Sequence, residues 1–404
     1  MNAFSFFKRN PNFGLVWIGQ VLSQTGSRMY QIALIWWLLS SLTEGTGVFM
    51  GLFMVACALP SILFVKQIGK SIESHSSRMI LIRSDVLASL LLFSVALLLK
   101  FSFFSPYAVF AVGFCAAILQ AFIDPTLNKS IPEVVADTDA ETAVALITTT
   151  QSIANFSGAV LGALLIQSMG VSGTIGFAAF GYLISSSCTS FAQFKTLKST
   201  ETPSQESGWE VLQSMPFVKK LLLGFALTNF FGSPVLVILP IYTRKVLMGD
   251  AHLLGFLEAS VWMGLIAGAF LSKLVHPKIS QTSLIAICVA FFGIGLSIPG
   301  LIAHPIVYSA SLLTIGIALG VNNVKVMAYF QSIVPNELKG RFFSLLQAAI
   351  SFTFPISYFL FGALTDYISI THVCLIQGFG VLGLSAFFFS LSPSQTLTES
   401  EVAV

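Results

Sequence analysis

The chain consists of long apolar runs separated by short polar segments. Each run is close to the roughly 20 residues that an α-helix needs to cross a bilayer. Twelve runs occur, centred near residues 27, 56, 90, 116, 154, 183, 230, 264, 291, 317, 353 and 382. Hydrocarbon admits only helices and closed barrels as spanning structures, and these runs lack the alternation of barrel strands. The pattern therefore predicts an all-α membrane protein with twelve transmembrane helices.

The longest polar stretch, residues 195–216, is rich in Ser, Thr and Glu and follows the sixth run. We interpret it as a cytoplasmic linker, because polar clusters with prolines between periodic segments are typical of loops. It separates an N-terminal six-helix half, residues 1–194, from a C-terminal half, residues 217–393. A polar tail follows over residues 394–404.

Short matches recur about 200 residues apart and in the same order. The sequence GALL begins at Gly162 and GALT at Gly362, and Gln24 in the first run corresponds to Asn229 in the seventh. This order indicates an internal duplication. Two pseudo-symmetric halves with a substrate site at mid-membrane are a known arrangement for transporters.

Composition supports a membrane protein and excludes several other classes. Only 9% of the residues are charged, against about 25% in a soluble domain. Threading twelve helices from a cytoplasmic N-terminus leaves only Lys100, Arg244 and Lys245 outside, so both termini are predicted to be cytoplasmic at the inner membrane. The basic residues are scattered, so no nucleic-acid partner is expected. No nucleotide-binding or hydrolase motif occurs, and His and Cys lack metal-ligand spacing, so we expect neither an enzyme, a metal nor a cofactor.

Two basic residues lie inside apolar runs, Arg28 in the first and Lys325 in the tenth. An intramembrane charge costs at least a few kcal/mol and usually faces a cavity or a partner. We therefore predict that both bind substrate, with the guanidinium of Arg28 holding an anionic group. The alternative for Arg28 is a structural ion pair with Asp85 or Asp124.

Two acidic residues are candidates for proton coupling. Asp124 lies in the fourth run at a depth similar to that of Lys325, so the two could pair across a closing cavity. Asp124 is the first candidate because hydrocarbon favours the protonated carboxyl, and Glu258 in the eighth run is the second. The alternatives are snorkelling side chains for Asp124 and Lys325, and an interfacial carboxylate for Glu258.

Neutral polar residues also interrupt the runs that we expect to line the cavity. Gln24, Asn229 and Asn322 are candidate substrate contacts. Hydrogen bonds between helices are an equally good explanation for such side chains in a membrane.

Four segments resemble the major facilitator superfamily. They are GKSIESHSSR at 69–78, SQTGSRMYQIAL at 23–34, VPNELKGRFFS at 334–344 and GALTD at 362–366. The first is similar to the family's loop G-x-L-A-D-R-x-G-R-R, and the others to S-Q-x-G-D-R, VP-E-x-x-GR-x-F-S and G-x-L-x-D of its drug- and siderophore-exporting branch. That branch contains macrolide efflux pumps and the enterobactin exporter.

The resemblance implies a gating role for the loop after the second run. Gly69 would let that helix approach its neighbour closely, while Glu73 and Arg78 would pair at the cytoplasmic face in one state. Glu337 or Arg341, before the eleventh run, is the implied partner. The sequence departs from the pattern: the loop Asp is Glu73, and the Asp of the first-run motif is Ser27.

These observations predict a secondary transporter that exports a small organic molecule, either a siderophore or a drug-like compound. Its halves would rock in alternating access, driven by protons. Arg28 and Lys325 favour an anionic substrate. The alternatives are an uptake transporter for a siderophore or nutrient and, from another class, a membrane protein for lipid handling or assembly.

Overall fold

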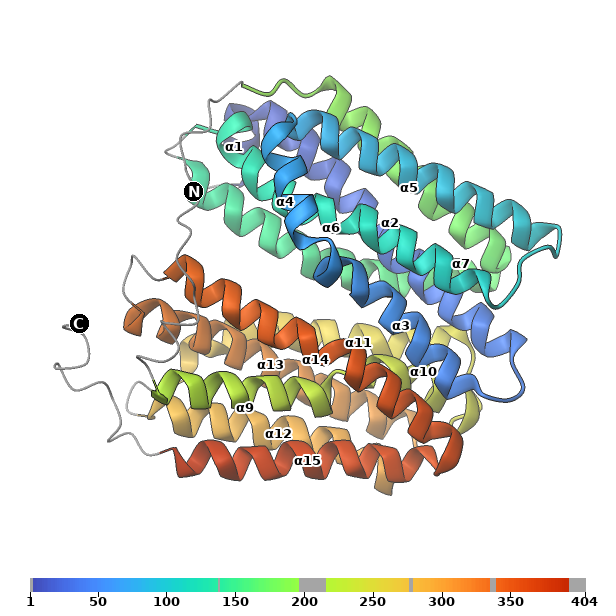
Figure 1. Ribbon diagram of the computed structural model, residues 1–404, viewed down its shortest axis with the longest axis vertical. Coiled ribbons are helices and arrows are strands. Elements are labelled where there is room, and N and C mark those ends of the chain that lie inside the picture. Colours follow the sequence, from blue (N-terminus) through green and yellow to red (C-terminus); the bar gives the residue numbers. More distant parts are fainter. Residues whose placement is uncertain (1–2, 137–138, 196–215, 276–278, 335–338, 392–404) are drawn as a thin grey trace. The chain divides into compact units, whose positions relative to one another are not determined.

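The computed structural model describes residues 3–136, 139–195, 216–275, 279–334 and 339–391. The predicted tail and all but the ends of the predicted linker lie outside these residues. Every regular element within them is helical (Figure 1). The first part of the chain forms α1 (Ala3–Arg9), α2 (Pro11–Ser41), α3 (Thr46–Leu63), α4 (Val65–Ser74), α5 (Ser77–Lys100), α6 (Ala108–Val134) and α7 (Ala140–Phe191). The second part forms α9 (Pro216–Gly232), α10 (Val235–Lys245), α11 (Ala251–Leu271), α12 (Gln281–Leu301), α13 (Pro305–Ile333), α14 (Lys339–Tyr367) and α15 (Ile370–Ser390), with a 3-10 turn η2 (Ser272–Leu274).

The predicted all-α membrane fold is confirmed, and each of the twelve predicted centres falls in a described helix. Ten segments of the described residues are long and apolar enough to cross a membrane. One of them contains two of the predicted helices, because α7 bends at Gly170, where φ is 72° and ψ is 177°. Glycine reaches this backbone region without steric cost. The first predicted helix, α2, is not among the ten, because it carries many polar side chains that the protein buries.

Contacts divide the chain into two units. Unit 1 consists of Met1–Thr43, Ala56–Glu201 and Asp250–Ala259. Unit 2 consists of Glu44–Val55, Thr202–Gly249 and Ser260–Val404. Two helices, α3 and α11, therefore contribute residues to both units.

In unit 1 the α2 helix packs along α7, which also packs against α5 (Figure 1). A side chain at Gly158 of α7 would be obstructed, because an added Cβ would lie 2.6 Å from the Cβ of Arg28 and 2.8 Å from the Thr25 carbonyl oxygen. Only glycine permits this approach. The glycine thus positions the middle of α2, including Arg28, against α7.

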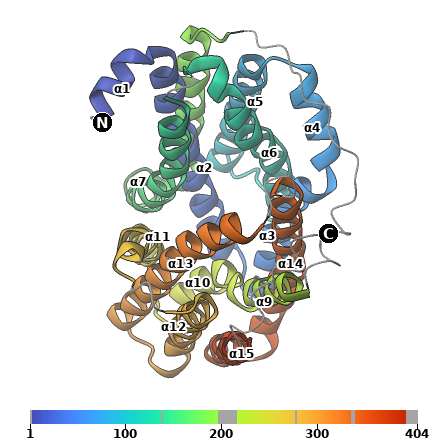
Figure 2. The same cartoon turned by 90° about the vertical axis from the view of Figure 1, so that its left-hand side faces the viewer.

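In unit 2 the α12 helix packs against α13 and α15, and α9 packs against α14 and α15 (Figure 2). The end of α14 also caps the start of α3. Asp366 accepts hydrogen bonds from the backbone N–H groups of Gly47 at 3.0 Å and Val48 at 2.9 Å. These N–H groups have no partner inside the helix, and a carboxylate there also interacts favourably with the helix dipole. The Asp of the GALTD segment therefore has a structural function.

We expect the change Asp366→Ala to lower the free energy of unfolding by about 0.5–2 kcal/mol, as the loss of a helix cap does. Asp366→Asn keeps an acceptor oxygen and should cost less. Thermal unfolding of the purified protein in detergent measures both. Equal losses in the two variants would show that the negative charge matters more than the hydrogen bonds.

Candidate functional site

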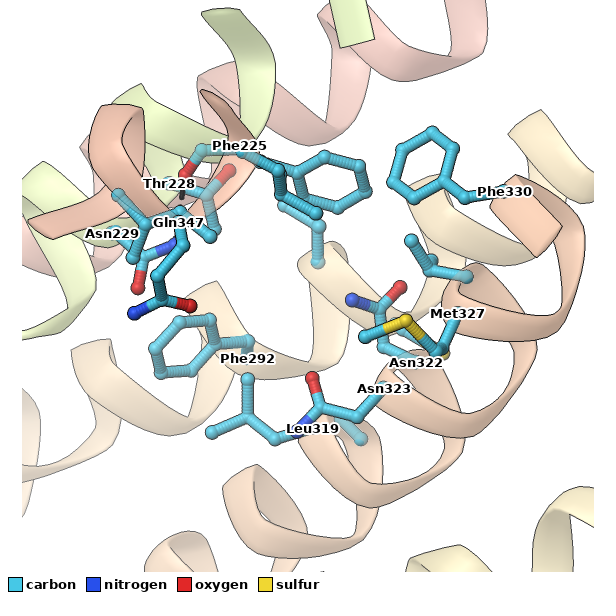
Figure 3. Close-up of a pocket in the computed structure, with 16 residues that line it drawn as sticks. Phe225, Thr228, Asn229, Phe292, Leu319, Asn322, Asn323, Met327, Phe330 and Gln347 are labelled. Atoms are coloured by element: carbon cyan, nitrogen blue, oxygen red, sulfur yellow. Dashed lines mark hydrogen bonds between the residues drawn. The ribbon is translucent and has the colours of Figure 1, made fainter. Parts of the chain in front are cut away.

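A cavity of about 480 Å³ opens within unit 2, between α9, α12, α13 and α14 (Figure 3). Its volume lies in the range of sites for drug-sized ligands. It is lined by Phe225, Thr228, Asn229, Cys288, Val289, Phe292, Ala318, Leu319, Asn322, Asn323, Val326, Met327, Phe330, Leu346, Gln347 and Ile350. None of these lining side chains carries a formal charge.

The polar groups of the cavity are amides and the hydroxyl of Thr228, placed among apolar and aromatic side chains. Figure 3 shows Asn229 and Gln347 on one side of the cavity, with Asn322 and Asn323 on another. The Asn229 amide donates to the Phe225 carbonyl at 2.9 Å, which leaves its oxygen as an acceptor. This lining suits an amphipathic molecule that forms a few hydrogen bonds and is otherwise apolar.

The side chain of Asn322 has a hydrogen-bond acceptor in this cavity that the described residues leave unsatisfied. Its Oδ1 atom is buried and has no hydrogen-bond partner among the described residues. A buried acceptor without a partner costs free energy. A ligand group that donates a hydrogen bond to Asn322 would remove this cost.

The sequence pattern indicated Asn229 and Asn322 as substrate contacts, but did not single out Gln347. An amide in the middle of the eleventh apolar run was an available signal. The aromatic lining could not be found in this way, because the chain contains 38 Phe residues without a distinguishing pattern.

Arg28 is buried in unit 1 and forms an ion pair with Glu258 at 2.6 Å between Nη2 and Oε2. Its Nη1 atom donates to the Gln31 side-chain oxygen at 3.1 Å. The acid that contacts Arg28 is thus neither Asp85 nor Asp124. Because Glu258 neutralises it, Arg28 offers no free positive charge to a substrate in this structure.

Glu258 is not the interfacial carboxylate that one alternative expected, since its exposed fraction is only 4%. The reason is the packing of the first part of α11 inside unit 1. An added Cβ at Gly255 would lie 2.8 Å from the Ala159 carbonyl oxygen of α7. This close contact carries Glu258, one turn further on, into the interior.

The other two charged candidates lie apart from the cavity lining. Lys325 is half-buried on α13, does not line the cavity, and forms no ion pair within the described part of the chain. Asp124 is half-buried on α6, with the side chain of Gln151 as a hydrogen-bond partner. Gln24 is buried on α2 and lines a second, much smaller cavity in unit 1.

The predicted gating residues show a different geometry from the expected one. An added Cβ at Gly69 would meet nothing within 4 Å, so the expectation of a close helix approach there is wrong. Glu73 is exposed, and the guanidinium of Arg78 donates to the Ser190 carbonyl near the end of α7. Glu337 lies outside the described residues. Arg341 lies in the first turn of α14.

A lysine that the sequence analysis did not single out holds the connection between α4 and α5. The ammonium of Lys129, on α6, donates to the Ile72 carbonyl at 2.5 Å and to the His75 carbonyl at 3.0 Å. A cation at the end of a helix satisfies its last carbonyl groups and interacts favourably with its dipole. The loop is therefore fixed by contacts to backbone carbonyls.

No group of three or more His, Cys, Asp or Glu side chains in the described parts of the chain is placed to hold a metal ion.

Comparison with known proteins places the chain among membrane transporters. Macrolide efflux protein A of Streptococcus pyogenes is 25% identical over 378 residues, covering 91% of this chain and 92% of that protein. The crystal structure of a point mutant of the nucleoside transporter NupG superposes with a TM-score of 0.75 at 9% identity, covering 95% of this chain and 99% of that one. That of a bacterial homologue of the iron transporter ferroportin superposes with a TM-score of 0.74 at 15% identity, with the same coverage.

The two solved structures establish the fold alone, at these low identities. The family assignment comes from the model for transmembrane secretion effectors, which matches residues 2–402. This match confirms the resemblance that the motifs indicated. The chain belongs to the transmembrane secretion effector family of the major facilitator superfamily, a family of multi-pass membrane transporters.

Proposed function

We propose that the protein exports an amphipathic organic molecule without acidic groups, of the macrolide class or similar in size and polarity. The observation that carries the proposal is the cavity of unit 2, with its amides and aromatic rings and its uncharged lining. The similarity to macrolide efflux protein A supports the same substrate class and the direction of transport. Transport proceeds by alternating access across the inner membrane, with both termini in the cytoplasm.

The lining favours this class over the anionic siderophore that the two intramembrane bases suggested. Burying a carboxylate without a cationic partner costs far more than burying amide or hydroxyl groups. Arg28 is paired with Glu258, and Lys325 does not line the cavity. Aromatic rings, by contrast, tolerate an amine on the ligand through cation–π contact.

Proton coupling is assigned to Glu258, with Asp124 as a second carboxyl. A proton on Glu258 removes the charge that holds Arg28 and leaves the guanidinium free for another partner. Breaking a buried pair changes the relative free energies of two states by several kcal/mol, enough to shift a conformational equilibrium. Both carboxyls belong to unit 1.

The first test uses a macrolide-sensitive bacterial strain and measures the accumulation of radiolabelled erythromycin with and without the protein. We expect lower accumulation in expressing cells and recovery after addition of a protonophore. Higher accumulation would indicate uptake, and no difference would reject a macrolide substrate. Accumulation that a protonophore does not alter would reject the proton coupling.

The change Asn322→Leu is expected to weaken export about tenfold, because it removes a buried acceptor from the cavity and reduces the hydrogen bonds to the ligand. The control is Thr314→Leu, an exposed position on the same helix that does not line the cavity. Dose-dependent accumulation of erythromycin measures both variants. Equal activity of the two would show that Asn322 does not contact the substrate.

A further inference from the structure

One face of α2 carries three polar side chains that do not line the cavity of unit 2. Trp17, Gln20 and Gln24 are spaced three and four residues apart, so they lie on the same side of the helix. Only 2% of Gln20 and 8% of Gln24 are exposed. Long amides so deeply buried in a membrane helix need hydrogen-bond partners.

The described residues of the protein do not supply those partners. Four buried atoms on this face lack a protein hydrogen bond within the described ranges: Trp17 Nε1, Gln24 Nε2, and both Nε2 and Oε1 of Gln20. Each such group costs free energy, and native proteins rarely accumulate several in one place. A cluster of this kind indicates a group that binds from outside the chain.

The same three side chains line a small, partly open cavity between α2, α6 and α7. Its volume is about 10 Å³, the space of a single water-sized group. Ser130 and Thr150 also line it, but their hydroxyls donate to the carbonyls of Leu127 and Leu146, each at 2.8 Å. The unused hydrogen-bonding capacity is therefore mostly that of N–H donors.

We propose that this face is a polar subsite of unit 1 that binds a hydrogen-bond-accepting oxygen of the transported molecule, such as a carbonyl, ether or hydroxyl. The inference rests on the proposed export function and specifies the substrate class further, as a polyoxygenated molecule. No basic side chain lines the cavity, so an anion is a poor occupant, and converging N–H donors repel a cation.

The internal duplication supports the same assignment independently. Gln24 corresponds in the repeat to Asn229, which lines the open cavity of unit 2. The duplicated helices therefore place an amide in a cavity in each unit. The two cavities differ in volume, at about 10 and 480 Å³.

The test compares Gln20→Met and Gln24→Met with Gln377→Met in the purified full-length protein. Gln377 is an equally buried amide, but its Nε2 donates to the Phe231 carbonyl at 2.9 Å. The measurements are the affinity for radiolabelled erythromycin and the midpoint of thermal unfolding. Methionine matches the length of glutamine without its hydrogen-bonding groups.

We expect Gln20→Met and Gln24→Met to weaken erythromycin binding about tenfold and to leave the unfolding midpoint unchanged or raised. Gln377→Met should lower the midpoint and leave the affinity within about twofold. Unchanged affinity in both α2 variants would overturn the subsite. A lowered midpoint in both would do the same, because it would show that their amides stabilise the fold itself.

If the proposed function is wrong, the wild-type protein will not bind erythromycin, and this result differs from a failure of the subsite alone. In that case the unfolding midpoints alone test the proposed subsite. A midpoint that is unchanged or raised in the α2 variants supports a face built for a ligand, and a midpoint lowered as in Gln377→Met rejects it.

Discussion

Replacing Glu258 with Gln is expected to destabilise the protein by about 3–5 kcal/mol and to abolish transport. The substitution leaves the guanidinium of Arg28 buried without its anionic partner, and removal of one member of a buried pair costs this much. The guanidinium cannot lose its proton to escape the penalty. Thermal unfolding and erythromycin accumulation measure the two effects.

The reverse change, Arg28→Met, should cost less, because the Glu258 carboxyl that remains can take up a proton and become neutral. The double variant Arg28→Met/Glu258→Met should recover most of the stability, since apolar side chains often replace a buried pair without loss. It should still fail to couple transport to protons.

The ion pair of Arg9 with Asp139 provides the matched control. Its 3.2 Å distance is also short, but 53% of the Arg9 side chain is exposed. We expect Arg9→Met to cost at most about 1 kcal/mol, because the arginine is solvated and the buried Asp139 carboxylate keeps its hydrogen bond from Asn10 Nδ2 at 2.8 Å. A similar loss from Arg9→Met and Glu258→Gln would contradict the role assigned to burial. Proton-coupled transport in the double variant would remove Glu258 from the mechanism.

The second large effect is expected from Gly158→Val. The Cβ would lie 2.6 Å from that of Arg28 and 2.8 Å from the Thr25 carbonyl oxygen, so α2 and α7 must separate. Overpacking of this kind typically costs about 1–3 kcal/mol, and the two further methyl groups of valine increase it. Unfolding midpoints and the yield of monodisperse protein measure the change.

Gly383→Ala is the control for a glycine within a helix. Gly383 lies in α15, and an added Cβ there meets nothing within 4 Å. Alanine should stabilise the helix by up to about 1 kcal/mol. If Gly158→Val is tolerated as well as Gly383→Ala, then the contact between α2 and α7 is not tight in the folded protein.

The sequence predicts the helices well because each must satisfy its own backbone in hydrocarbon, which depends on local composition. The amides Asn229 and Asn322 could be found for the same reason, since a polar group in an apolar run is conspicuous. The partner of Arg28 could not be found in this way. Glu258 lies 230 residues further along the chain, and only the packing of the beginning of α11 shows that it reaches Arg28.

The function of Asp366 was likewise not visible in the sequence. The GALTD segment was informative as a resemblance, but its carboxylate caps a helix that lies over 300 residues earlier. For Asp366 a contact was missed, whereas for Gly69 a contact was predicted that the described residues do not make. The motif suggested close packing at Gly69, and the space around it is open. In both cases the motif marks a family, while the contact depends on the fold.

The contribution of Asp250–Ala259 to unit 1 has a consequence for biosynthesis. Residues 1–201 emerge from the ribosome well before this segment is synthesised. Unit 1 is therefore incomplete at first. Until the segment is synthesised, the face of α7 that contacts Gly255 and the guanidinium that pairs with Glu258 lack these partners. Two fragments cut within 202–249 and produced together should therefore assemble, while the first fragment alone should be degraded.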